Sequence, residues 1–271
     1  MKSYAIYDED IDRSIPIGYL FYYEKANSFI IELCEDLDEW DAPLLFQGLV
    51  KRKIYTVSKE YSLMWVRERI IPSGRQNIGL ILKNHNMNEY SEIAFLTMNN
   101  GRCIQDNCYI KEINIDELPK SIYQRMEKNI AECFITEDKE LLCMFKDNSV
   151  KKVDLNKLVD KNSDISYIIE NDEFRQNIEI GVGGYSVVFN KMIDVMASDL
   201  RENGLSIPLS TRDFYNFVQR NVVDTPKAYE MLNCTRQNLS YMVSEGKLTP
   251  IVYGAKGNLY AKGDIEDLRQ L

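Results

Sequence analysis

The chain has 271 residues, 45% of them hydrophobic and 28% charged, which is the composition of a folded protein with two or three domains and excludes a disordered one. A net charge of −9 argues against a protein that holds nucleic acid by bulk charge alone. No run approaches the roughly 18 apolar residues of a membrane span, and residues 1–10 are too polar for a secretory signal, so we expect a cytoplasmic protein without membrane contact.

The six cysteines contain no CxxC pair, and His85 is the single histidine. This pattern indicates reduced structural thiols rather than disulfides or a zinc site. His85 lies in a polar stretch without a nucleophile or carboxylate at a useful spacing, which indicates a surface or capping residue rather than a catalyst. We therefore expect no enzymatic activity, no metal and no cofactor.

Residues 1–115 are predicted to form a mixed α/β N-terminal domain. Segments 16–24 and 28–33 are rich in aromatic and β-favouring residues, which suggests a strand pair or a strand that leads into a helix. Residues 44–50 suggest a buried helix, and the Asn-Asn-Gly-Arg sequence at 99–102 indicates a turn.

The most polar patch of this domain contains three arginines, Arg67, Arg69 and Arg75. One interpretation is an anion or partner contact, in which Gly74 and Gly79 let backbone amides approach a ligand. The other interpretation, which the sequence favours, is that these arginines pair with the acidic stretch at residues 36–41.

Residues 116–204 are predicted to form a small β-rich domain, entered through a helix that follows Leu118 and Pro119. Residues 130–155 suggest three strands joined by turns, with Asp147 to Ser149 at a hairpin tip. Residues 173–190 suggest another hairpin, about Gly183 and Gly184. Because strand-like residues follow these glycines, they do not indicate a dinucleotide-binding loop.

This region also carries a resemblance, through the motifs Phe145-Lys-Asp147-Asn, Val153-Asp154-Leu155, Asp172-Glu-Phe174 and Phe189-Asn-Lys-Met-Ile-Asp194-Val. On these motifs, residues 130–204 resemble a small bacterial domain of unknown function, which occurs alone or beside helix-turn-helix proteins in mobile-element and toxin–antitoxin-like operons. That family usually has Trp where this chain has Phe189. The resemblance implies a small β-rich fold and no known chemistry.

Residues 205–271 are predicted to form an extended segment, a helix from Ser210, and then two short helices joined by a turn and followed by a β-ribbon and a closing helix. Thr225 is the expected cap of the first short helix, and Pro226 its first residue. Thr235 is the expected cap of the second, which Gly246 ends. Helical spacing directs six apolar residues inward: Ala228, Met231, Leu232, Leu239, Met242 and Val243.

The outward side of the second short helix is rich in side chains that recognise DNA. Arg, Gln and Asn read base edges, and hydroxyl and ammonium groups contact phosphates. The predicted DNA-binding residues are Thr235, Arg236, Gln237, Asn238, Ser240, Tyr241 and Lys247, with Lys256 at the tip of the ribbon. Residues 220–271 hold seven Lys/Arg and six Asp/Glu, about +1, which leaves about −10 for the rest and predicts modest, salt-dependent affinity.

The segments Thr225-Pro-Lys-Ala-Tyr-Glu-Met-Leu, Thr235-Arg-Gln-Asn-Leu and Glu245-Gly246-Lys-Leu are similar to the excisionase and MerR-type winged helix-turn-helix family. Residues 254–260 match the wing of that family and 263–268 its final helix. The resemblance implies that Arg236, Gln237, Asn238 and Tyr241 enter the groove of DNA, with Lys256 in the wing. The family wing usually carries more basic residues than the Lys256 and Lys262 of this chain.

The sequence therefore predicts an α+β, multi-domain protein with a C-terminal winged helix-turn-helix at residues 205–271. It predicts a homodimeric, sequence-specific binder of double-stranded DNA that regulates transcription in a bacterium or mobile element. The alternative is an interaction protein, such as an antitoxin-like protein, an inhibitor or an adaptor, whose acidic surface binds a protein partner. An enzyme that uses residues 67–75 ranks last, because no acid–base pair, nucleophile or metal set has convergent spacing.

Overall fold

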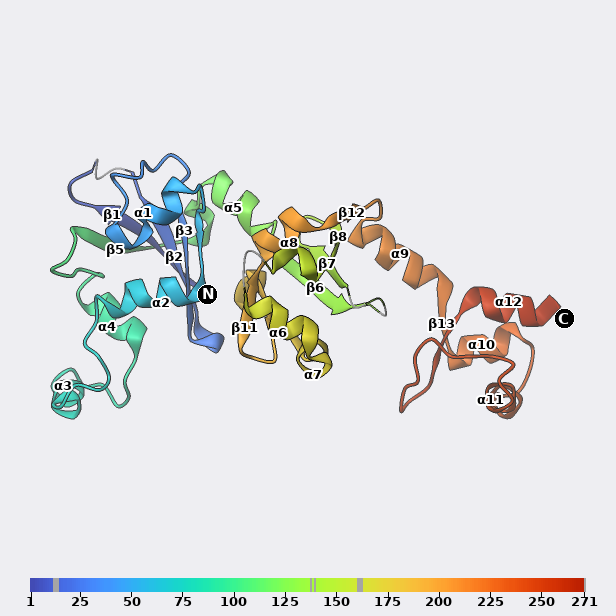
Figure 1. The fold of residues 1–271 in the computed structure, drawn as a ribbon. Coiled ribbons are helices and arrows are strands. Elements are labelled where there is room, and N and C mark those ends of the chain that lie inside the picture. The colour runs from blue at the N-terminus through green and yellow to red at the C-terminus, as the bar shows by residue number, and fades with distance from the viewer. Residues whose placement is uncertain (12–14, 137, 139, 160–162, 271) are drawn as a thin grey trace.

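The computed structural model describes residues 1–11, 15–136, 138, 140–159 and 163–270. The protein is a mixed α+β protein whose described strands form four antiparallel sheets. Figure 1 shows three groups of elements in succession along the chain. We refer to them as the N-terminal part (residues 1–126), the central part (127–210) and the C-terminal part (222–270).

The N-terminal part is built on a five-stranded sheet in the order β4-β3-β2-β1-β5. Its strands are β1 (Lys2–Asp8), β2 (Gly18–Tyr23), β3 (Ser28–Leu33), β4 (Thr56–Val57) and β5 (Cys108–Ile113). The pairing of β2 with β3 decides between the two predicted alternatives in favour of a strand pair. Nearly every residue of these two strands is buried, since layers of side chains cover both faces of the sheet.

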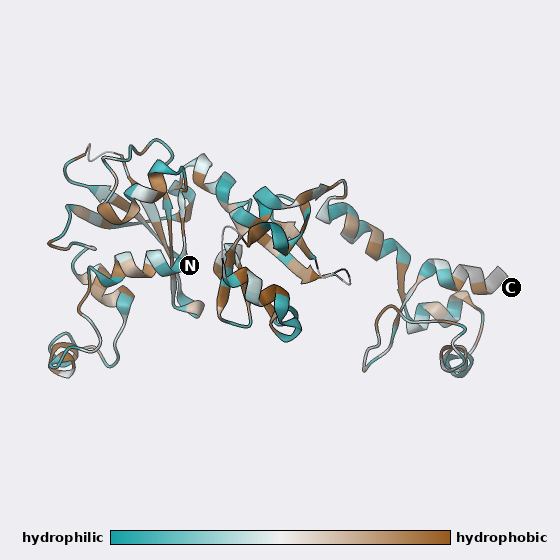
Figure 2. Ribbon diagram, in the orientation of Figure 1, coloured by the Kyte–Doolittle hydropathy of each residue, from teal (hydrophilic) through white to brown (hydrophobic). Residues whose placement is uncertain are grey.

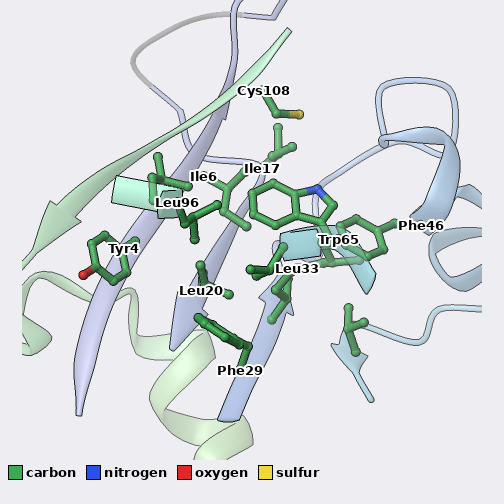
Figure 3. Close-up of a cluster of buried hydrophobic side chains, with 14 of the residues drawn as sticks. Tyr4, Ile6, Ile17, Leu20, Phe29, Leu33, Phe46, Trp65, Leu96 and Cys108 are labelled. Atoms are coloured by element: carbon green, nitrogen blue, oxygen red, sulfur yellow. The ribbon is translucent and has the colours of Figure 1, made fainter. Parts of the chain in front are cut away.

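One face of this sheet packs against helices around Trp65, which is fully buried (Figure 3). The helices of the N-terminal part are α1 (Leu44–Lys51), α2 (Lys59–Arg67), α3 (Ile78–Asn84) and α4 (Glu92–Met98). Trp65 stacks on Phe46 of α1 with ring centroids 6.4 Å apart. The backbone N–H of Ile31 in β3 donates to the Ser62 hydroxyl of α2 at 2.9 Å, which fixes this helix on the sheet.

The opposite face of the sheet is covered by α5 (Lys120–Met126), which follows a 3₁₀ turn, η2 (Ile115–Glu117). Leu118 and Ile122 are buried there against Phe21 and Tyr19 of β2. The helix predicted as an entry to the next domain is therefore packed on the first sheet, and the N-terminal part extends past residue 115. A second 3₁₀ turn, η1 (Glu24–Ala26), joins β2 to β3.

The central part contains two smaller sheets, ordered β12-β8-β7-β6 and β11-β10-β9. Their strands are β6 (Ile130–Ile135), β7 (Leu141–Phe145), β8 (Val150–Val153), β9 (Ile178–Ile180), β10 (Ser186–Phe189), β11 (Ile193–Met196) and β12 (Leu205–Ile207). Between and after them lie η3 (Leu155–Leu158), α6 (Asp164–Glu170), α7 (Asp172–Gln176), η4 (Val182–Gly184) and α8 (Ala197–Asn203).

The strands of residues 130–155 and the hairpin tip at residues 147–149 agree with the sequence prediction. Ser149 donates to the Asp147 carboxylate through its backbone N–H and its hydroxyl, and Asn148 has a φ of 67°. The hairpin about Gly183 is also confirmed, since β9 pairs with β10 across η4. Residues 172–176 form a helix rather than a strand, because Asn171 caps the backbone N–H groups of Glu173 and Phe174.

Gly183 and Gly184 lie where the central part meets the N-terminal part. Their φ angles are 61° and 77°. A Cβ on Gly183 would lie 2.4 Å from the hydroxyl of Tyr23, and one on Gly184 would lie 2.1 Å from the carbonyl oxygen of Ile130. Glycine is therefore needed here both for the left-handed backbone and for the close approach.

Helix α9 (Thr211–Asn221), predicted to start at Ser210 and capped by that residue, leads from the central part to the C-terminal part (Figure 1). The C-terminal part comprises β13 (Val222–Asp224), α10 (Thr225–Met231), α11 (Arg236–Ser244), β14 (Leu259–Ala261) and α12 (Lys262–Gln270). Among the described residues, no helix combines the length and apolar character needed to cross a membrane.

Candidate nucleic-acid interface

Helix α10 begins at a cap that also ties it to the β-ribbon. Asp224 accepts the backbone N–H of Lys227 at 2.9 Å, so Asp224 rather than the expected Thr225 is the N-cap. The Thr225 hydroxyl instead donates to the carbonyl of Asn258 at 3.1 Å and accepts its N–H at 2.9 Å. These two hydrogen bonds of Thr225 connect the start of α10 to the ribbon.

Helix α11 begins after a tight turn, as predicted. Asn233 has a φ of 51°, and the N–H of Cys234 donates to the carbonyl of Tyr229 at 3.0 Å. Thr235 then caps α11, since its hydroxyl accepts the N–H of Asn238 at 3.2 Å. At the other end, Gly246 has a φ of 70°, the left-handed stop expected for a helix end.

The two helices share one small core. Ala228, Leu239, Leu248 and Tyr260 are buried in it, together with Ile265 of α12. The other predicted inward residues, Met231, Leu232, Met242 and Val243, are partly buried against the same core. One side of α11 is therefore held by α10 and the ribbon, and the inward spacing predicted from the sequence is confirmed.

The other side of α11 is open to solvent. The predicted DNA-binding residues on and just after it are all exposed: Thr235, Arg236, Gln237, Asn238, Ser240, Tyr241 and Lys247. Within the described part of the chain, the side chains of Arg236 and Gln237 form no hydrogen bond or ion pair with other residues. The Lys247 ammonium lies 5.8 Å from the centre of the Tyr241 ring. The Ser240 hydroxyl donates to the carbonyl of Arg236 at 3.0 Å and keeps its oxygen free to accept.

The β-ribbon that follows α11 carries one basic residue at its tip, Lys256. Its turn closes with a 3.1 Å hydrogen bond from the N–H of Gly257 to the carbonyl of Gly254, which places the exposed Lys256 at the tip as predicted. The first segment of the ribbon, residues 251–253, forms only an isolated bridge, from Val252 to Leu259. The exposed side chains of this segment are apolar: Ile251 (56% exposed), Val252 (48%) and Tyr253 (70%).

The main partner of β14 is β13, which the sequence did not indicate. Val222, Val223 and Asp224 pair with residues 259–261. A segment of three residues that leads directly into a helix is too short to show the alternating pattern of a strand. This pairing joins the residues before α10 to those before α12, and it holds the ribbon against the two helices.

The arginines of residues 67–75 do not form one patch. Arg67 pairs with Glu92 at 3.0 Å. The Arg69 side chain is buried, pairs with Asp106 and stacks over Trp65 at 3.7 Å, while Arg75 is exposed. The favoured interpretation, pairing with the acidic stretch 36–41, named the wrong carboxylates for Arg67 and Arg69, because α4 and the loop before β5 lie closer to them.

A buried ion pair at the edge of the N-terminal part escaped the sequence reasoning. Glu32 of β3 is fully buried, and it accepts hydrogen bonds from Arg125 at 2.8 Å and from the Thr56 hydroxyl at 3.0 Å. Burial raises the pKa of Glu32, while Arg125 and Thr56 oppose the shift. A single glutamate inside an otherwise apolar strand is the only sequence signal that could have revealed it.

A cavity of about 360 Å³ opens beside this ion pair, and its lining includes Thr56, Arg125, Tyr185, Ala197 and Arg201. Arg125 is already bound to Glu32, Glu35 and the carbonyl of Leu33. Arg201 is bound to Asp147 and lies over the Phe145 ring. Arg125 and Arg201 are thus held by carboxylates of the protein itself, while Arg201 Nη1 is buried without a hydrogen-bond partner among the described residues and Lys128 also lines the cavity.

Other chemistry-bearing residues are dispersed. His85 is the exposed C-cap of α3, as predicted. The six cysteines are free thiols. Among the residues that the structure describes, no group of three or more His, Cys, Asp or Glu side chains is arranged to hold a metal ion.

The exposed face of α11 thus brings together several side chains with base-reading and phosphate-binding chemistry on one rigid element. The rest of the described chain uses its charged groups mainly in internal pairs or solvated positions. Comparisons of the chain with protein-family models, with curated proteins and with solved structures gave no match.

Proposed function

We propose that residues 205–271 form a winged helix-turn-helix that binds double-stranded DNA, with α11 in the major groove, and that the protein is a sequence-specific transcriptional regulator of a bacterium or mobile element. In this proposal α10 supports α11, and the ribbon is the wing. The N-terminal and central parts position or regulate the DNA-binding part.

One observation carries the proposal: the exposed side of α11 presents Arg236, Gln237 and Asn238 in its first turn, while Leu239 on the opposite side is buried. The N-terminal residues of a recognition helix are the ones that contact base edges. Arg pairs bidentately with guanine, and Asn or Gln with adenine. The chemistry and the position on the helix therefore agree.

The surroundings of this turn suit the sugar–phosphate backbone. Thr235 and Tyr241 carry hydroxyl groups, and Lys247 and Lys256 carry ammonium groups, all of them exposed. The positive end of the α11 dipole also favours a phosphate near Thr235. The first carboxylate of the face is Glu245, beyond the last residue of α11, so no negative charge interrupts the reading residues.

Selection from a random-sequence duplex library tests the proposal. Immobilised full-length protein retains duplexes at about 50 mM salt, where phosphate contacts are strongest. Fluorescence anisotropy of a recovered duplex then measures affinity for the wild type and for Arg236→Ala/Gln237→Ala. We expect the double variant to bind at least about 30-fold more weakly, since each bidentate base contact contributes about 1–3 kcal/mol.

A matched control exists within the chain, because the tripeptide Arg-Gln-Asn occurs both at 236–238 and at 75–77, where it is also exposed. Arg75→Ala/Gln76→Ala removes the same charge and the same amide from the N-terminal part. Its affinity for the recovered duplex should equal that of the wild type. Equal losses for both double variants would show that bulk charge, rather than α11, holds the DNA.

A second function is favoured by the apolar ribbon. Ile251, Val252 and Tyr253 are exposed where a DNA-binding wing would carry basic residues, and the chain has a net charge of −9. Both features suit an interaction protein that binds a partner through an acidic or apolar surface. Failure of the library to yield any retained duplex, together with a stable protein partner whose binding is lost in Tyr253→Asp, would favour this function.

A further inference from the structure

Helix α9 carries an apolar side chain, Phe217, that the rest of the described chain leaves exposed. Phe214, Phe217 and Val218 follow the i, i+3, i+4 spacing of one helical face. Phe217 is 61% exposed, and the other two are only partly buried. Figure 2 shows hydrophobic and hydrophilic residues alternating along this helix. An amphipathic helix normally buries its apolar stripe, so this one lacks a partner within the described chain.

The central part covers a different side of α9. Thr211 is buried, its backbone N–H donating to the carbonyl of Asn148, and the Tyr215 hydroxyl donates to Glu132 of β6. Phe217 lies half a turn past Tyr215 and therefore points away from this contact. The segment that leads into α9 adds exposed apolar side chains, since Leu205 is 65% exposed and Leu209 is 43% exposed.

The charges beside Phe217 indicate what covers it. Asp213 lies one turn before Phe217 and Arg220 one turn after it, and both are exposed. If a second α9 packs antiparallel about a two-fold axis at Phe217, Asp213 of each helix meets Arg220 of the other, with an offset of only about 1.5 Å along the helix axis. A parallel pair would instead place like charges together.

We propose that this face of α9 is a homodimer interface, in which the Phe217 side chains of two copies meet at a two-fold axis and two Asp213–Arg220 pairs flank them. The face is self-complementary in its apolar centre and in its flanking charges, as an isologous interface must be. Self-association of this kind does not depend on DNA, so it stands or falls separately from the function proposed above.

Sedimentation equilibrium of the full-length protein without DNA provides the test. We expect a dimer for the wild type and at least a tenfold weaker association for Phe217→Asp. Leu80→Asp is the matched control, because Leu80 of α3 is 60% exposed, nearly as much as Phe217 at 61%, on a helix of the N-terminal part. It should associate like the wild type.

Charge exchange distinguishes this interface from a general apolar contact. Arg220→Asp should weaken the dimer by placing two carboxylates together at each of the two flanking sites, and Asp213→Arg/Arg220→Asp should restore it. Asp213 also bonds to the Ser210 hydroxyl at the start of α9, so circular dichroism of each variant must match the wild type. A monomeric wild type, an unaffected Phe217→Asp dimer or a failed restoration in a folded double variant would each overturn the proposal. If the wild type sedimented as a monomer alone but formed a complex with a different protein through this face, the face would belong to that partner and not to a second copy.

Discussion

Arg125 of α5 donates a 2.8 Å hydrogen bond from its Nε to the fully buried carboxylate of Glu32 in β3, and its Nη1 reaches Glu35 at 2.7 Å. The pair connects the helix that covers the N-terminal sheet to β3, the strand beside the edge strand β4. The same helix leads into the central part, whose Tyr185 lies beside Glu32. The ion pair therefore lies close to the junction of the two parts, which the Lys59–Asp194 pair also crosses.

We expect Arg125→Met to lower the free energy of unfolding of the N-terminal part by about 3–5 kcal/mol, because it leaves the Glu32 carboxylate buried without its cation. Glu32→Leu/Arg125→Met should recover most of that loss, since it removes both charges from the interior. Urea unfolding followed by tryptophan fluorescence measures this part selectively. Both tryptophans, Trp40 and Trp65, belong to it, and Trp65 is fully buried.

The control for this experiment is Glu35→Gln. The Glu35 side chain is 53% exposed, so its pair with Arg125 is screened by solvent and should contribute less than about 1 kcal/mol. If Glu35→Gln destabilised the protein as much as Arg125→Met, the exposed rather than the buried partner would hold the helix.

Gly184→Ala should destabilise the central part by at least about 2–3 kcal/mol, because it adds a backbone clash to the strain of a left-handed residue. The added Cβ would lie 2.1 Å from the carbonyl oxygen of Ile130. Hydrogen exchange of the β6 and β10 amides localises the effect.

Gly246→Ala separates the cost of the left-handed backbone from the cost of the backbone clash. Gly246 has a similar φ, 70°, but a Cβ there would meet nothing within 4 Å. It should therefore cost only about 1–2 kcal/mol, the penalty of the left-handed conformation, and should leave exchange in β6 unchanged. If Gly184→Ala destabilised the central part no more than Gly246→Ala destabilises the C-terminal part, a small backbone movement near Ile130 would relieve the clash at no cost in stability.

Local sequence patterns predicted much of the fold where a pattern repeats over a whole element. The aromatic and aliphatic runs of β2 and β3, the three strands of residues 130–155 and the inward stripe of α10 and α11 are of this kind. Elements of three to five residues, such as β13 and α7, are too short to show a period. Their structure depends on a distant strand or on one capping side chain.

The Arg-Gln-Asn tripeptide shows why site residues are harder to predict than elements. It occurs at residues 75–77, 175–177 and 236–238. The first is exposed before α3, while Arg175 is buried and bound to the carbonyl of Ile169 at 2.8 Å. The third lies exposed on α11. Identical tripeptides have different roles because tertiary packing decides which of their side chains are buried and which remain exposed. The tripeptide itself does not encode this packing.

Cys133 and Cys34 should react slowly with iodoacetamide at pH 8. Burial raises the pKa of the Cys133 thiol to about 11, and burial together with Asp36 raises that of Cys34 to about 12. Only the thiolate reacts, so alkylation should be at least about 100-fold slower than for free cysteine, whose pKa is about 8.5. The rates should keep rising from pH 8 to pH 10, because both thiols remain largely protonated there. Mass spectrometry of each peptide measures the rate.

Unfolding in urea provides the comparison for the thiols, since it should return both sites to the reactivity of free cysteine. Reaction of folded Cys133 at close to the free rate would show that β6 opens often enough to expose it.

The last prediction separates base reading from phosphate contact in the proposed DNA complex. Lys256 lies at the ribbon tip and Arg236 in the first turn of α11. A lysine that neutralises one phosphate contributes a slope of about −0.9 to the dependence of log affinity on log salt, so Lys256→Ala should reduce the slope by that amount and weaken all duplexes alike. Arg236→Ala should instead cost about 1–3 kcal/mol on the preferred duplex and relax the preference at one base pair. Salt titrations on the recovered duplex and on single-base variants of it measure both effects, with Lys83→Ala, an exposed lysine of α3, as the control that should change neither. A change of base preference in Lys256→Ala, with the salt slope intact, would mean that the ribbon rather than α11 reads the sequence.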